Sequence, residues 1–259
     1  MRYIFFLILI FIDLVSGYGQ QQDKWLLNKS THFIIYYKNA PEEFIRELAD
    51  RCEDYYNRIA DDLGFRRFDF WLWDERAQVF IYDDLKDYQG SGEQPAWSGG
   101  FVLTKEKVIK TYPNAQGFFE NLLPHELGHI IFREFVGFDN PAVPLWLDEA
   151  VASYQEKSRY SLADTVIKIA MKKKNFLDLE KLAKLNPYSI TDRETVELFY
   201  LESYSTMNFL LNRFGREKFV SFCKELKEDR NLNKALEKSY SFKDIGELDR
   251  AWQDYLKNG

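Results

Sequence analysis

The chain has 259 residues, enough to bury a full core as one large domain or two closely packed lobes. Its hydrophobic content of 46% and aromatic content of 17% are values of a globular protein. The formal net charge of −6 at pH 7 offers no basic surface, so we expect no nucleic acid among its partners.

The N-terminal segment has the pattern of a secretory signal peptide. Arg2 precedes an unbroken apolar run from Ile4 to Ile12, and the small residues Ser16, Gly17 and Gly19 suit cleavage by a signal peptidase. The run is shorter than the ~20 residues that span a bilayer. We predict that residues 1–19 are removed, that the mature chain has no membrane span, and that it is secreted or periplasmic. An uncleaved segment that anchors the chain in a membrane is the alternative.

The first part of the mature chain predicts a small α/β lobe, residues 25–113. A polar arm over 20–28 is followed by a strand at 31–38, a helix from Pro41 to Leu63 that Gly64 ends, and strands at 78–82, 99–103 and 107–111. Residues 83–100 predict a surface loop, with a flap over the active site as the alternative.

The second part, residues 114–259, predicts an all-helical lobe. We expect helices at 125–136, 144–157, 161–174, 192–213, 215–227 and 242–257. Pro124 lacks a backbone N–H, so it lies in the first turn of its helix or kinks a longer one. The order of elements predicts an α+β fold with a short mixed sheet in the first lobe and a cleft between the lobes.

Two cysteines in an exported chain suggest a disulfide between Cys52 and Cys223. Each of them, however, falls on the apolar stripe of a predicted helix, as a small buried side chain would. We favour two buried thiols, with the disulfide as the alternative. His32 lies in the first predicted strand, where we expect a structural role.

The residues His125-Glu126-Leu127-Gly128-His129 form an H-E-x-x-H motif. Two imidazoles four residues apart on a helix are offset by roughly 40° and ~6 Å, so both can reach one zinc ion. Glu126 projects about 100° away from His125, beside the position of a catalytic water, where it can serve as general base. We therefore predict one Zn²⁺ per chain, held by His125, His129 and a third ligand.

The third ligand is predicted from a second acidic cluster, Leu147-Asp148-Glu149, on the following helix. Adjacent residues on a helix point about 100° apart, so only one of the two carboxylates can face the histidines. Spacing favours Glu149 but leaves Asp148 open.

This combination resembles the gluzincin metallopeptidases, which include thermolysin and the aminopeptidase N family, and within them a compact, peptidase MA-like branch. The likeness extends over roughly residues 30–257. The segment Pro144-Leu145-Trp146-Leu147-Asp148-Glu149 matches the gluzincin pattern P-x-W-L-x-E, which implies a zincin-like fold with Glu149 as the third ligand. A metzincin site would instead need glycine at position 132 and histidine at 135, where both residues are phenylalanine.

The resemblance also implies a tyrosine that hydrogen-bonds the reacting carbonyl. Tyr200, in Tyr200-Leu201-Glu202-Ser203, matches that position, with Tyr204 as the alternative. By the same analogy, Lys107–Thr111 could be an edge strand that pairs with a peptide substrate. The chain lacks the G-x-M-E-N segment with which aminopeptidases grip a free amino terminus.

The sequence thus predicts an exported zinc metallopeptidase that acts on peptides or proteins, an endopeptidase more than an aminopeptidase. Two other hypotheses stay open: a zinc-binding interaction module, and a hydrolase of a non-peptide amide or ester. The oligomeric state is not predicted.

Overall fold

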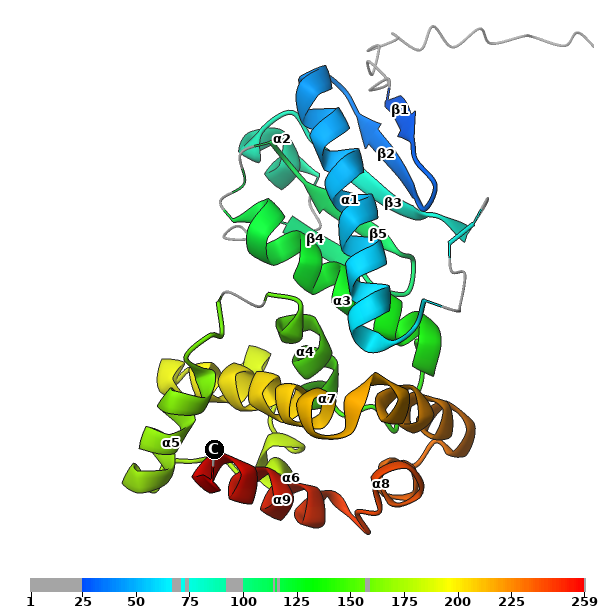
Figure 1. The fold of residues 1–259 in the computed structure, drawn as a ribbon. Coiled ribbons are helices and arrows are strands. Elements are labelled where there is room, and N and C mark those ends of the chain that lie inside the picture. The colour runs from blue at the N-terminus through cyan, green and yellow to red at the C-terminus, as the bar shows by residue number, and fades with distance from the viewer. Residues whose placement is uncertain are drawn as a thin grey trace, which may run out of the picture.

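A five-stranded mixed sheet forms one side of the protein in this computed structural model (Figure 1), which describes residues 25–258 except 67–70, 73–74, 92–99, 114, 116 and 157–158. The strands lie in the order β1–β2–β3–β5–β4. Their bounds are Leu26–Lys29 (β1), Phe33–Tyr37 (β2), Ala77–Ile81 (β3), Gly100–Leu103 (β4) and Val108–Thr111 (β5). The three inner strands run parallel, and β1 and β4 pair antiparallel at the two edges.

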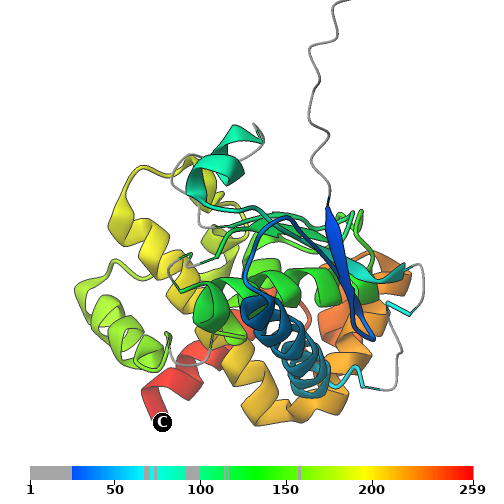
Figure 2. The same ribbon diagram turned by 90° about the horizontal axis from the view of Figure 1, so that it is seen from above.

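Alternation of side chains along the inner strands gives the sheet one core face. Phe33 and Ile35 of β2, Val79 and Ile81 of β3 and Ile109 of β5 are fully buried, whereas the residues between them are partly exposed. Helices α1 (Glu42–Leu63) and α3 (Leu123–Val136) lie side by side against this face (Figure 2). The helix that carries the H-E-x-x-H motif is therefore fixed against the sheet.

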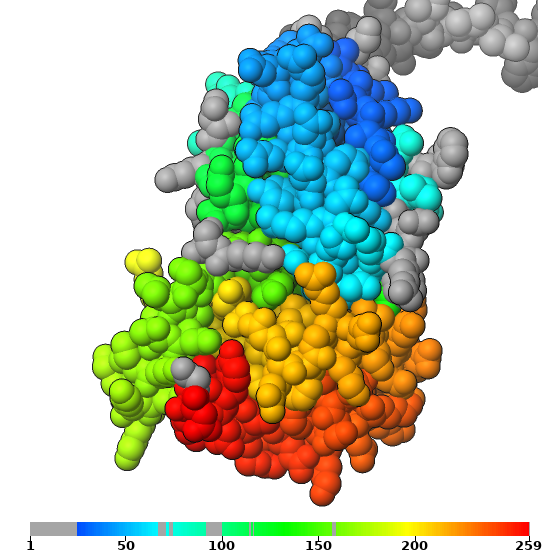
Figure 3. Space-filling view, viewed as in Figure 1, coloured from blue at the N-terminus to red at the C-terminus, as the bar shows by residue number. Residues whose placement is uncertain are grey.

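The remaining helices form a second layer, built around the long helix α7 (Figures 1 and 3). Helices α4, α5 and α8 all pack on α7, which Gly215 breaks with φ 81° and ψ 168°. The helices of this layer are Leu145–Tyr154 (α4), Ala163–Lys173 (α5), Leu179–Leu182 (α6), Arg193–Asp229 (α7), Leu232–Tyr240 (α8) and Ile245–Asn258 (α9). The short helix α2 (Leu85–Gly90) lies beside the sheet instead.

The predicted α+β class with a short mixed sheet and a helical C-terminal part is confirmed. Two details of the strands were wrong. Part of the supposed N-terminal arm, Leu26–Lys29, pairs with β2 as an edge strand, and its mostly exposed side chains show no alternation between a buried and an exposed face. The segment 107–111 is not an edge strand: β5 lies between β3 and β4, so β4 forms that edge.

The predicted long helices are present, with ends that differ by a few residues. Gly64, with φ 78°, ends α1 as expected. The two helices predicted on either side of residue 214 are the two halves of α7, separated by the kink at Gly215. The short helices α2, α6 and α8 were not predicted.

Several predictions concern residues that the structure does not describe. The signal peptide lies outside the described residues, as do residues 92–99 of the 83–100 segment, whose earlier part forms α2. Within the described part of the chain, no helix has the length and apolar character needed to cross a membrane.

The isolated thiols and the third histidine lie in structural environments. Cys52 and Cys223 are both buried and free, and burial raises the pKa of each thiol. The ring of His32 stacks on Tyr56 with centroids 3.8 Å apart, and its Nδ1 lies 2.6 Å from Glu53 Oε2. The structure thus contains no disulfide between these two cysteines.

Two buried carboxyl groups fix the start of α6 against its neighbours. Glu202 of α7 accepts a hydrogen bond from the Leu177 N–H at 3.1 Å, and Asp249 of α9 accepts one from the Leu179 N–H at 3.0 Å. Burial raises the pKa of Glu202 to about 9 and also raises that of Asp249.

Glu202 should make the stability of the fold depend on pH. Its pKa rises on folding from an ordinary value of 4.5, so its contribution is fully present below pH 4.5 and is lost as pH rises toward 9. We expect the free energy of unfolding to fall over this window by on the order of 1 kcal/mol per pH unit. In Glu202→Gln the slope should flatten, and in Glu197→Gln, an exposed position of the same helix, it should not. Urea unfolding at several pH values measures this; equal slopes in all three proteins would contradict it.

Candidate metal centre

The H-E-x-x-H helix has an irregular beginning. Gly117 takes a left-handed conformation with φ 69°, and a single π-helical turn, Phe118–Leu122, leads into α3. Pro124 lies in the first turn of α3, where its missing N–H needs no partner. Single π turns are often found at functional sites, because they change the direction in which side chains project.

A buried asparagine holds the connection between α3 and α4. Asn140 donates from Nδ2 to the carbonyl oxygens of Val136 and Leu226, both at 2.9 Å, and its Oδ1 accepts from the Ala142 N–H at 3.0 Å. One side chain thereby joins the end of α3, the loop before α4 and the helix α7. The relative position of α3 and α4 is fixed at this point.

Gly128 allows α3 and α4 to approach closely. A Cβ atom at this position would lie 3.0 Å from Ala152 Cα and 3.1 Å from Gln155 Cγ, closer than ordinary contacts. Because Gly128 directly precedes His129, the close approach occurs at the level of the predicted ligands. It brings Glu149 within reach of the two imidazoles.

The structure brings the three predicted ligands together. His125 Nε2 and His129 Nε2 are 3.2 Å apart, and Glu149 Oε2 lies 3.5 Å and 3.6 Å from them. Asp148, the open alternative, does not join this set; its Oδ1 lies 3.1 Å from Nδ1 of His129. The group His125, His129 and Glu149 is thus arranged as a candidate metal site.

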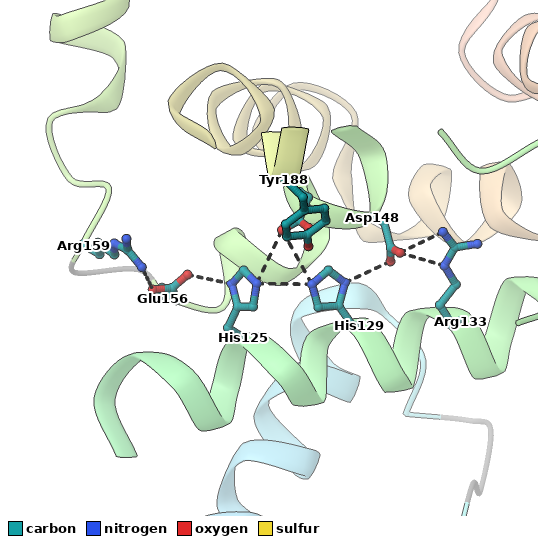
Figure 4. Close-up of polar contacts among 8 residues, drawn as sticks. His125, His129, Arg133, Asp148, Glu156, Arg159 and Tyr188 are labelled. Atoms are coloured by element: carbon teal, nitrogen blue, oxygen red, sulfur yellow. Dashed lines mark hydrogen bonds and ion pairs between the residues drawn. The ribbon is translucent and has the colours of Figure 1, made fainter. Parts of the chain in front are cut away.

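Each of these three side chains is held through the polar atom that faces away from the other two ligands, and Figure 4 shows this for the two histidines. Glu156 Oε1 lies 2.7 Å from Nδ1 of His125, and Asp148 occupies the corresponding place beside His129. The Tyr188 hydroxyl donates to Glu149 Oε1 at 2.6 Å. A carboxylate beside Nδ1 favours the tautomer that leaves a lone pair on Nε2, so three acceptor atoms converge on one point.

These distances fit zinc. Four ligand atoms 2.0–2.1 Å from a tetrahedral zinc ion are separated by about 3.3 Å, close to the three separations found here. Glu149 Oε2 is buried and has no hydrogen-bond partner in the described part of the chain. A buried carboxylate oxygen facing two imidazole nitrogens is a donor set that zinc prefers.

Protons and a metal ion compete for the imidazole nitrogens of this site. Burial opposes charge on His125, yet the neighbouring carboxylates of Glu149 and Glu156 raise its pKa to about 9. The pKa of His129 is also raised against burial, chiefly by Asp148, and the imidazoles hold the pKa of Glu149 well below its usual range. Binding of a metal must therefore release protons from the imidazoles.

A cavity of about 430 Å³ opens beside His125. It is lined by Gly117, Asn121, Leu122, His125, Glu126, Glu156, Arg159, Tyr160 and Tyr200. The predicted base and the predicted carbonyl-binding tyrosine therefore both face it. Burial raises the pKa of Glu126, against the attraction of the neighbouring imidazoles.

The two candidate tyrosines differ in position. Tyr200 lines the cavity. Tyr204, one turn further along α7, is not part of the cavity wall; its ring stacks on Tyr154 and Tyr160 at centroid distances of 6.1 Å and 5.0 Å. The geometry favours Tyr200.

Three contributors to the site were missed by sequence reasoning. Glu156 follows Glu149 by seven residues, two turns of the helix predicted to run to residue 157, so its spacing contained a signal, although α4 itself ends at Tyr154. Arg159 follows Glu156 by three residues and also lies beyond the end of α4. Tyr188 comes from the turn Pro187–Ser189 before α7, and nothing in the local sequence points to the metal.

An H-E-x-x-H pair on α3 and a glutamate on the next helix, α4, form the arrangement of a zincin-type metal centre. Residues 72–258 match the Peptidase MA superfamily, and the chain belongs to it. This is a superfamily of peptidases that are typically zinc-dependent. Comparison with curated proteins gave no match.

Loss of the third ligand should release the metal. We expect the wild-type protein to carry one equivalent of zinc and Glu149→Ala to lose it, because two imidazoles alone bind zinc weakly. Asp148→Asn should keep its zinc with an affinity reduced about 10–100-fold, as for a residue that orients a ligand. Elemental analysis and competition with a chelator measure both. If Glu149→Ala kept its zinc while Asp148→Asn lost it, the ligand assignment would be reversed.

Proposed function

We propose that the protein is an exported zinc metallopeptidase that hydrolyses internal peptide bonds. The observation that carries this proposal is the convergence of His125, His129 and Glu149 beside a cavity whose wall contains Glu126. Membership of the Peptidase MA superfamily supports it. A metal that only stabilised a fold would need no carboxylate base beside an open cavity.

Bound zinc would acidify a water molecule and polarise the carbonyl of the scissile bond. Glu126 projects from the same helix as the two histidines and faces the cavity, so it can take a proton from that water and pass it to the leaving amine. Burial raises the pKa of this carboxyl group above its ordinary value, which makes it a stronger base than an exposed glutamate.

Tyr200 can hold the oxygen of the reacting carbonyl. Burial and then the charge of Glu149 raise the pKa of its phenol, so the hydroxyl stays protonated and can donate a hydrogen bond. A donor placed at the developing oxyanion stabilises the transition state more than the ground state. Tyr188, whose hydroxyl donates to Glu149 Oε1 at 2.6 Å, holds that carboxylate in place.

The edge strand β4 gives an extended peptide a place to bind. Its first residue, Gly100, lies against Leu122 of the cavity wall: a Cβ atom on Gly100 would clash with Leu122 Cδ2. A strand added to this edge would therefore run toward the cavity. The sequence has no G-x-M-E-N segment for a free amino terminus, which favours cleavage within a chain.

Removal of the base should abolish turnover without removing the metal. We expect Glu126→Gln to reduce kcat by at least about 10²–10⁴-fold on peptides cleaved by the wild type, because no group then takes the proton of the water. Zinc content should stay at one equivalent. The measurement is cleavage of a mixed peptide library, followed by mass spectrometry, with and without a chelator. Wild-type rates in the variant would exclude Glu126 as base.

The two tyrosines of α7 make a matched pair. Tyr200→Phe should lower kcat by on the order of 10²–10³-fold with little change in KM, since the lost hydrogen bond acts mainly in the transition state. Tyr204→Phe, whose ring lies outside the cavity, should stay near the wild-type rate. Steady-state kinetics on one cleaved peptide decide between them, and the reverse pattern would move the role to Tyr204.

A further inference from the structure

We propose that Arg159 is a specificity residue, which binds a carboxylate of the substrate in the cavity beside the metal site. This inference rests on the proposed peptidase function and names the class of substrate that the site takes: peptides with an acidic group next to the cleaved bond. That group is either an Asp or Glu side chain or the C-terminal carboxylate.

The inference begins with a row of charged groups that crosses the site (Figure 4). Each imidazole is followed by a carboxylate and then by a guanidinium: Glu156 and Arg159 on one side, Asp148 and Arg133 on the other. The two ends of the row have the same chemistry but different surroundings. That difference shows which arginine is available to a ligand.

Arg133 is occupied by its partner. Its Nε and Nη2 both contact Asp148 Oδ2 at 2.8 Å, and its side chain is only 15% exposed. The position of Arg133 on α3, one turn after His129, places it within the helix layer. Its role is to hold the carboxylate that orients His129.

Arg159 is held at one point and open elsewhere. Its Nη1 donates to Glu156 Oε2 at 2.8 Å, and the side chain is 59% exposed. The guanidinium lies over the ring of Tyr160, 5.4 Å from the centroid. A guanidinium has five N–H donors, so a single bond to Glu156 leaves most of them for a ligand. Glu156 is itself buried, which gives the arginine a rigid anchor.

Arg159 lies where its free N–H donors can contact a substrate bound at the metal site. It lines the same cavity as His125 and Glu126, and among the described residues of the wall it is the only lysine or arginine. When the carbonyl of a substrate lies at the metal site, the side chains next to the cleaved bond therefore lie close to this guanidinium. Arginine pairs with carboxylates through two parallel hydrogen bonds, which rewards an acidic group and disfavours a basic one.

A purely structural arginine would behave differently. If Arg159 only oriented Glu156, its replacement would weaken every substrate alike and would lower zinc affinity through His125. A specificity residue changes the ratio between acidic, neutral and basic substrates. The test therefore compares ratios within each variant.

The experiment uses the full zinc-loaded chain and peptides that differ only in Glu, Gln or Lys at the positions flanking the cleaved bond. Each peptide is made with a free and with an amidated C-terminus. We expect wild type to favour the carboxylate peptide over its neutral partner by roughly 10–100-fold in kcat/KM, mainly through KM. Arg159→Gln should remove the preference, so that the ratio of kcat/KM between the Glu and Gln peptides falls to about 1, and Arg159→Glu should favour lysine. Arg213→Gln, an exposed arginine on α7, is the control.

A binding measurement separates this inference from the proposed function. Hydroxamates of the Glu and Gln peptides are titrated calorimetrically into zinc-loaded Glu126→Gln, with and without Arg159→Gln, so that no turnover is needed. If the Glu compound binds more tightly than the Gln compound, and Arg159→Gln abolishes this difference, the inference is supported even without cleavage. Equal binding of the two compounds, binding of neither, or a uniform loss in Arg159→Gln overturns it. In the cleavage experiment, a preference that is lost when the C-terminus of the peptide is amidated identifies the C-terminal carboxylate as the group that Arg159 binds. A preference that remains after amidation identifies the acidic side chain.

Discussion

The metal site depends on the contact that the protein makes with one of the two polar atoms of each ligand side chain, which leaves the other atom to bind the metal. An imidazole has two nitrogens and a carboxylate two oxygens, and a side chain that can turn does not present a fixed donor. Here Glu156, Asp148 and Tyr188 engage the outer atom of His125, His129 and Glu149 respectively, so the inner atoms face one another. The separations of 3.2–3.6 Å follow from these outer contacts.

The fold supplies the three elements from which those contacts come. The sheet and α1 fix α3, and Asn140 fixes α4 relative to α3. Helix α7 then packs on α4 and contributes Tyr200, while the turn before α7 brings Tyr188 onto Glu149. The three ligands lie within 24 positions of one another, and the site is completed by Tyr188 and Tyr200, which come 39 and 51 positions after Glu149. The cavity forms where these segments meet.

The sequence contained the part of the site that is local. Helix periodicity and the H-E-x-x-H spacing place two imidazoles on one face, and the acidic pair after Pro144 offers a third donor. Choosing Glu149 over Asp148 needed the resemblance to gluzincins, because the rotation of one helix against another is set by packing. Gly128 and Asn140 control that packing through contacts that spacing does not reveal.

Tyr188 and the strand order illustrate what a single sequence cannot supply. Tyr188 reaches the site from a turn of ordinary composition, and its partner lies 39 residues away. The same limit produced the error at β5: alternation predicted a strand over 107–111, but the order of strands depends on which neighbour each edge finds. The place of a site residue was predictable where ligands recur at helical spacing within one helix. It was not predictable where the residue comes from a separate segment of the chain.

Gly128 also limits how freely the motif can vary. The two middle positions of H-E-x-x-H are usually treated as unconstrained, yet here the second of them is in contact with the backbone of the neighbouring helix. An alanine would require the neighbouring helix to shift by a few tenths of an ångström, and a larger residue would require more. The distance between α3 and α4 therefore depends on the absence of a side chain at Gly128. A sequence pattern that required a small residue at this position would select chains able to close the same pair of helices.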